Sequence, residues 1–134
     1  MMDVAVAFAN VLKKTGTSLY TLNGTRVYVD KLPSDFVNTT TAILFYVRGG
    51  GSSMYVEEHD VDFVVQVYGG TPSISHARAV YLAMADLLFS SENLVVSGGC
   101  MLNAQVTSFA QDQEDPDTHH PYVLCFYRVS LRPI

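Results

Sequence analysis

The stretch that decides the fold is residues 61–89, V-D-F-V-V-Q-V-Y-G-G-T-P-S-I-S-H-A-R-A-V-Y-L-A-M-A-D-L-L-F. Its first part alternates with the period of a β-strand, and one face carries only apolar residues: Val61, Phe63, Val65 and Val67. Gly69-Gly70 ends this strand, and residues 71–73, Thr-Pro-Ser, are typical helix starters. The apolar residues then recur at helical spacing: Ala79, Val80, Ala83, Met84, Leu87 and Leu88. We therefore expect a strand that turns into a helix packed back on the sheet.

The composition indicates one domain with unusually little charge. A chain of 134 residues can build one proper core but is too short for two. Apolar residues make up 49% and charged residues only 16%, against a usual charged share of about 25%. Because apolar surface that is not needed in the core marks interfaces, this balance favours an oligomer.

The charge and cysteine patterns exclude several classes of protein. The net charge is −5 and no basic run occurs, which argues against binding nucleic acid through its phosphates. Cys100 and Cys125 lie far apart and outside any C-x-x-C motif, so we expect two buried thiols. The first residues lack the charged start of a signal peptide, and the apolar run at residues 4–12 is too short to span a bilayer. The sequence thus predicts a soluble protein made in the cytoplasm.

The first half of the chain predicts a helix and two strands before the central stretch. Residues 3–14 form an amphipathic helix, which could cover the sheet or dock on a neighbour; its ordinary stripe favours covering. Residues 17–28 are polar and β-branched with a turn signal at Asn23-Gly24, and a short strand is expected at 26–29. The apolar run at 42–47 suits a central strand.

A glycine-rich segment, R-G-G-G-S-S-M-Y-V-E-E at residues 48–58, follows that strand. We interpret it as a flexible connection that reaches toward a neighbouring subunit. A phosphate-binding loop would need a lysine at its end and a helix after it, and neither occurs here.

The last third predicts strands at 94–96, 101–109 and 122–131, with a bend at Gly98-Gly99. The final strand is apolar on both faces, so it should be interior to its sheet. Residues 111–121, Q-D-Q-E-D-P-D-T-H-H-P, should form an exposed acidic hairpin tip. The predicted fold class is α+β, a mainly antiparallel sheet packed against an N-terminal helix and one central amphipathic helix, in a single domain over residues 1–134.

Three groups of residues are candidates for a reactive site. The acidic tip at 111–121 lacks the fixed spacing and glycine of a carboxylate loop, and adjacent His119 and His120 cannot face one ion together. A Ser-His-Asp set from His76, Asp86 and Ser73 or Ser75 lacks a nucleophile elbow, so a capping serine and a surface histidine are expected.

The third group is the aspartate pair Asp60 and Asp62, with His59 beside it. Two aspartates at the start of a strand more often guard its edge than act as acid and base. The sequence therefore predicts no catalytic, cofactor-binding or metal-binding residue, and no enzyme.

The order of elements resembles the tail terminator family of long-tailed bacteriophages, also called tail completion, tail-to-head joining or minor capsid proteins. An N-terminal helix is followed by R-V-Y-V-D-K-L-P at 26–33, A-I-L-F-Y-V-R-G-G-G at 42–51, D-V-D-F-V-V-Q-V-Y-G at 60–69, A-R-A-V-Y-L-A-M-A-D-L-L at 77–88 and Y-R-V-S-L at 127–131. The resemblance covers nearly the whole chain in order and texture. The triple glycine with Ser52-Ser53 and the long acidic hairpin do not match the family pattern.

The resemblance implies a virion protein without an active site. Members form a ring, commonly a hexamer, that caps the head-proximal end of the tail tube, stops its polymerisation and joins it to the filled head. The implied partners are other copies, the tail tube protein and the neck proteins, while DNA passes through the lumen without specific binding. A neck adaptor of the same particle, or a small α+β enzyme or ligand-binding domain, are the alternatives. Subunit contacts are expected first at Val64, Tyr68, Tyr81 and Leu82.

Overall fold

The computed structural model describes residues 2–34, 36, 39–52, 57–70, 73–116 and 120–134. Its elements in chain order are helices α1 (Val4–Leu12) and α2 (Ser18–Asn23), strands β1 (Val27–Val29), β2 (Thr41–Ser52) and β3 (His59–Gly69), helix α3 (Ile74–Ser90), and strands β4 (Leu94–Val96), β5 (Gly99–Glu114) and β6 (Pro121–Arg132). None of the described helices has the length and apolar character needed to cross a membrane.

The strands form one sheet in the order β1-β2-β3-β6-β5-β4. The β1–β2 pair is parallel and the other neighbouring pairs are antiparallel. The α+β class is thus confirmed, with a mixed sheet. The interior place predicted for the last strand is also confirmed, because β6 lies between β3 and β5.

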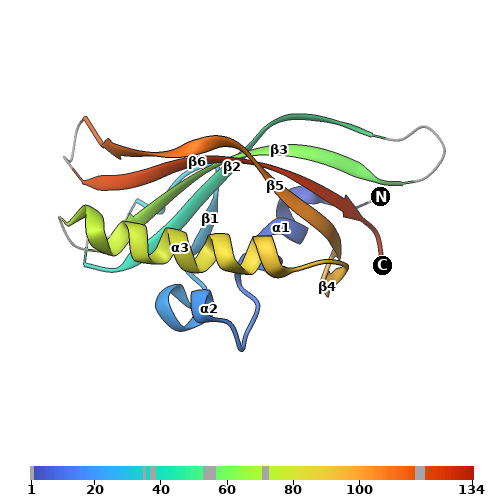
Figure 1. Ribbon diagram of the computed structural model, residues 1–134, viewed down its shortest axis with the longest axis horizontal. Helices are drawn as coiled ribbons and strands as arrows, with labels where there is room; N and C mark the ends of the chain where they lie inside the picture. The colour runs from blue at the N-terminus through green and yellow to red at the C-terminus, as the bar shows by residue number, and fades with distance from the viewer. Residues whose placement is uncertain (1, 35, 37–38, 53–56, 71–72, 117–119) are drawn as a thin grey trace.

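The main core lies between one face of this curved sheet and the helices (Figure 1). The alternating residues of β3, from Val61 to Val67, all point into it, as the period-two pattern predicts. They meet β6 residues on the same face: Val123, Cys125, Tyr127, Val129 and Leu131. Phe8 of α1 stacks on Phe63 with 4.2 Å between ring centroids and meets Phe45 edge-on at 5.0 Å.

Helix α3 begins as the sequence predicts, with Ser73 as its cap accepting a hydrogen bond from the backbone N–H of Ser75. Its buried residues are Ala77, Val80, Ala83, Met84 and Leu88. Ala79, predicted in this stripe, is exposed, and Leu87 is only half-buried. At 3.6 residues per turn Ala79 points away from the side set by Ala77 and Met84.

Helix α2 was not predicted from the sequence, which indicates only a turn at Asn23-Gly24 and a short strand at 26–29 in this region. Thr17 caps this helix by accepting a hydrogen bond from the Tyr20 N–H, and Leu19 and Asn23, one turn apart, are both buried. The local cap and the burial of these two side chains outweigh the low helix propensity of the threonines.

The flexible connection expected at residues 48–58 is wrong for its glycines, which belong to β2. Gly49 pairs with Asp62, Gly50 with Val61 and Gly51 with Asp60. At Gly50 φ is +147° and an added Cβ would overlap the carbonyl oxygen of Asp60. Glycine therefore allows a close strand pairing here, and the β2–β3 hairpin becomes a long arm (Figure 1).

The predicted acidic tip at 111–121 is likewise mostly strand. Gln111 pairs with Leu124, and Glu114 pairs with Pro121. Residues 117–119, with His119, lie outside the described residues. Antiparallel hairpins thus extend the sheet at both of its ends (Figure 1).

Candidate functional site

The candidate histidine and aspartate of helix α3 are not brought together. The described part of the chain contains no group of three or more His, Cys, Asp or Glu side chains that could hold a metal ion. His76 and Asp86 lie ten residues apart on the single helix α3, which separates them by about 15 Å along its axis. The Ser-His-Asp geometry that acyl transfer needs is therefore not formed by these residues.

Asp60 and Asp62 lie on an interior strand, so the prediction that they guard a sheet edge is wrong. Asp60 accepts a hydrogen bond of 2.5 Å from the Ser130 hydroxyl. Asp62 accepts two from the Arg128 guanidinium, at 2.8 and 3.2 Å. Both partners come from the neighbouring strand β6, at the paired positions of the register.

These pairs form a polar strip on the helix-free face of the sheet. The Arg48 guanidinium carbon lies 5.3 Å from the centroid of the Phe126 ring, a cation–π arrangement. The hydrogen bonds from Arg128 hold the pKa of Asp62 below 3.8, and the charge of Arg48 adds to this. The carboxylate is thereby kept ionised and its neighbouring arginine occupied.

The Asp62–Arg128 pair predicts a small, pH-dependent contribution to stability. Because the pKa of Asp62 is lowered in the folded state, its contribution is present above pH 3.8 and is lost as the pH falls through the lowered value. Asp62→Asn should therefore reduce the urea midpoint slightly at pH 7 and leave it unchanged at the acid end. An equal loss at both pH values would show that the charge is not responsible.

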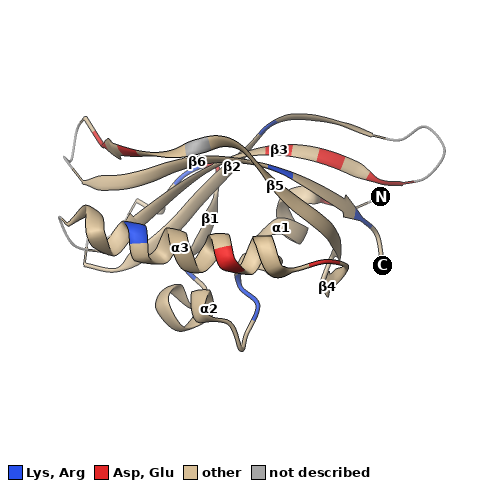
Figure 2. Ribbon diagram, in the orientation of Figure 1, with Lys and Arg blue, Asp and Glu red and all other residues tan. Residues whose placement is uncertain are grey.

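A second ion pair ties α3 to the long hairpin. The Arg78 guanidinium contacts both carboxylate oxygens of Asp112, which lies on β5. Figure 2 shows basic and acidic residues scattered over several of the described helices and strands.

The two cysteines are buried and unpaired, as predicted. Burial raises the pKa of the Cys125 thiol to about 12. Since the thiolate is the reactive form, Cys125 is chemically inert at neutral pH.

Two of the expected subunit contacts are wrong, because Val64 and Tyr68 are buried within the chain. Tyr68 belongs to a small second core on the helix-free face with Ala42 and Leu44. Residues of β1 and the following segment cover it: Tyr28, Leu32 and Phe36. Burial raises the pKa of Tyr68 to about 12.

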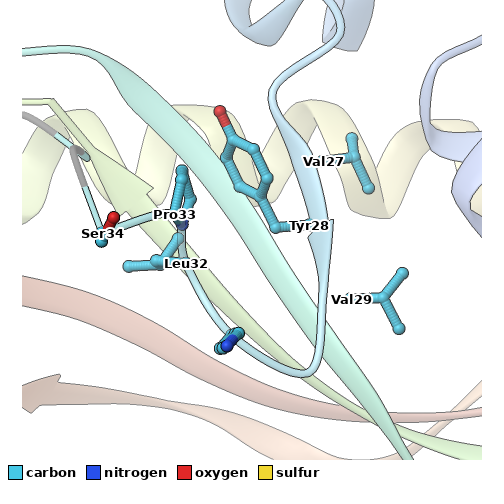
Figure 3. A pocket seen from close by; sticks show the side chains of 7 residues that line it. Val27, Tyr28, Val29, Leu32, Pro33 and Ser34 are labelled. Carbon is cyan, nitrogen blue, oxygen red and sulfur yellow. The ribbon is translucent and has the colours of Figure 1, made fainter.

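The segment after β1 also borders an open hollow (Figure 3). Val27 and Val29 point to one side of β1, and Tyr28 points to the other, toward Leu32 and Pro33. The charged residue in its lining is Lys31. Because most of its described lining is apolar, the hollow suits contact rather than catalysis.

Exposed apolar side chains lie along two opposite edges of the sheet, the β4–β5 edge and the β1–β2 edge. On one side Leu82 and Phe89 of α3 are 60% and 90% exposed, and Val106 of β5 is 53% exposed. On the other, Val29 of β1 and Val47 of β2 are exposed. Leu82 was expected from the sequence. Phe89 was not, although its position off the buried stripe of the helix is a signal that could have identified it.

The first side is hollowed into a groove between α3 and β5. Its lining includes Phe89 and Asp86 from the helix and Gln105 and Val106 from the strand. A neighbouring hollow is lined by Arg78, Leu82 and Asp112. This face has the features of a contact surface, with apolar centres bordered by polar groups.

The comparisons with known proteins identify the fold. No protein-family model and no curated protein matches the chain. Among solved structures that match is a chain of one described as "Virion of native gene transfer agent (GTA) particle", with 22% sequence identity and a TM-score of 0.68. The match covers 96% of this chain and 97% of that one. The two chains therefore share one fold from end to end.

Proposed function

We propose that this chain is a structural protein of a phage-like virion. The observation that carries the proposal is the end-to-end likeness of its fold to a chain of the gene transfer agent virion. Because both chains are covered almost completely, the likeness extends over the length of each chain and is not limited to a shared motif. The gathering of apolar side chains on exposed surfaces supports assembly as its work.

Within that class we propose a tail terminator, found in the tail or neck of the particle. Copies of the chain form a ring, most simply a hexamer, on the head-proximal end of the tail tube. The ring stops tube polymerisation and presents the surface that joins the neck proteins of the filled head. The protein has no catalytic role in this proposal.

The charges support a ring through which DNA passes without being held. The net charge is −5. Arg78 and Arg128 are each paired with a carboxylate, so neither is free to bind a phosphate. A surface of this kind repels DNA or leaves it unbound, and the genome can slide past.

The proposal predicts a closed oligomer in solution. We expect mass photometry of the untagged protein to give a single species of several 14.7 kDa chains, most simply six, alone or with tail tube protein added. Adding this protein to polymerising tail tube protein should stop tube growth. A protein that stays monomeric at high concentration with tube protein present would contradict the ring.

A neck adaptor is the second candidate, since the likeness to a virion chain supports it equally. Binding to purified tail tubes supports the terminator, whereas binding only to empty heads that carry the connector supports the adaptor. A small enzyme or ligand-binding domain is tested by metal analysis and by thermal shift with divalent ions. No bound metal and no shift would leave assembly as the role.

A further inference from the structure

The two long open edges of the sheet lie at the same level on opposite sides of the molecule. β1 pairs with β2 at Ile43–Phe45, and from Tyr46 onward no described strand pairs with the outer edge of β2. β4 pairs with β5 over Gly99–Met101, and the Asn93 N–H just before β4 donates a hydrogen bond to the Leu102 carbonyl. Among the described residues no strand pairs with the outer edge of β5 beyond that point.

The register connects these two edges through the sheet. One row runs Val47, Phe63, Tyr127, Val106, from β2 through β3 and β6 to β5. Side chains at paired antiparallel positions share a face, so all four point to the helix side. Phe63 and Tyr127 in the middle are buried, while Val47 and Val106 at the ends are 44% and 53% exposed. The row is an apolar layer whose two ends are uncovered.

On the basis of the proposed ring, we infer that the β2 edge of one copy docks beside the β5 edge of the next, with Val47 against Val106. Three antiparallel steps separate β2 from β5, so the two strands run in opposite directions. A rotation about an axis along the strands preserves those directions. The neighbouring edges therefore meet antiparallel, and the contact is head-to-tail, as a ring requires.

On the helix side of the sheet, the apolar residues of the β1–β2 edge match the apolar groove between α3 and β5 of the next copy. The groove beside Val106 is walled by Phe89, and Leu82 lies further along the same helix. Val29 lies beside Phe45 in the register and faces the same side as Val47, at the other edge of the sheet. Docking brings the valines of the β1–β2 edge to the apolar groove of the next copy and removes both from water.

Charge agrees with this orientation. Asp86 is exposed in the wall of the groove, and Lys31 is exposed in the turn after β1. Neither makes an ion pair within the described residues. Of the two exposed charged residues in that turn, Asp30 and Lys31, the lysine is the one that would attract Asp86 of a second copy. Bulges in β5 after Val106 restrict regular backbone pairing to residues 103–106.

The test uses single cysteines and a short bis-maleimide. Untagged chains carrying Val47→Cys and Val106→Cys, co-expressed, should give a covalent dimer containing one of each, identified by mass spectrometry of the linked peptides. Each variant alone should give none, because a head-to-tail contact never places two copies of one residue together. The native protein is the blank, since Cys100 and Cys125 are buried.

Val6→Cys with Val106→Cys is the matched control, because Val6 is 48% exposed but lies on α1. Efficient cross-linking of Val47→Cys to itself, or equal cross-linking in the control pair, would overturn the assignment. If the untreated protein has the mass of an oligomer and the Val47–Val106 link does not form, this contact is wrong and the ring stands. If it is monomeric throughout, both fail.

Discussion

Replacing Phe8 with alanine is expected to lower the free energy of unfolding by about 3–5 kcal/mol, the usual cost of removing a buried phenylalanine. Phe8 is fully buried and contacts the rings of Phe45 and Phe63 from the adjacent strands β2 and β3. Its loss opens a cavity at the point where α1 meets the sheet. Urea unfolding followed by tyrosine fluorescence measures the effect, because the chain has eight tyrosines and no tryptophan.

Phe89→Ala is the matched control for this experiment. Phe89 is almost fully exposed, so its truncation leaves no internal cavity. Both variants are compared at a concentration where light scattering shows single copies, since assembly would add to the apparent stability. Equal midpoints for Phe8→Ala and the unmodified protein would mean that α1 is not docked on the sheet.

Replacing Gly69 with alanine is expected to cost about 1–3 kcal/mol or more, as overpacking against an unyielding neighbour does. A Cβ at this position would overlap the backbone nitrogen of Ala77 and lie 2.7 Å from the carbonyl carbon of His76. Both belong to the first turns of α3, so the helix would have to move away from the end of β3. The urea midpoint should fall, and amide exchange should increase in α3.

Gly49→Ala provides the comparison, because nothing lies within 4 Å of a Cβ there. Its free energy of unfolding should lie within a few tenths of a kcal/mol of that of the unmodified protein, since nothing in the fold crowds an alanine at this open position. Equal urea midpoints for Gly69→Ala and Gly49→Ala would mean that the close contact between β3 and α3 does not limit the size of the residue at position 69.

The elements predicted well from sequence are those whose pattern is local. In the stretch from β3 to α3 the apolar period changes from two to helical at a glycine pair, so both elements can be read directly. β6 could be placed inside the sheet because both of its faces are apolar. The α2 helix was not predicted. Its threonines favour other conformations, and the cap at Thr17 and the burial of Leu19 and Asn23 are evident only in the folded chain.

The features that could not be predicted depend on partners far away in the chain. Asp62 and Arg128 are 66 residues apart in the sequence, so the local sequence around either residue does not predict their ion pair. Tyr68 has the outward position that the alternation predicts, yet the segment around Leu32 and Phe36 folds over it. The three glycines indicate flexibility by composition, and their strand conformation arises from pairing with β3. Surface exposure, and with it the candidate contact site, follows from such pairings.

The placement of the chain ends has a practical consequence for experiments. Both ends lie on the side of the molecule toward which the β2–β3 arm extends (Figure 1). The backbone N–H of Met2 donates a hydrogen bond of 2.8 Å to the Glu57 carboxylate, close to the outer end of that arm. A purification tag fused to either end would crowd the arm and leave the opposite hairpin free. A dense label at a terminus would conversely serve as a landmark for the arm in electron micrographs of assembled particles.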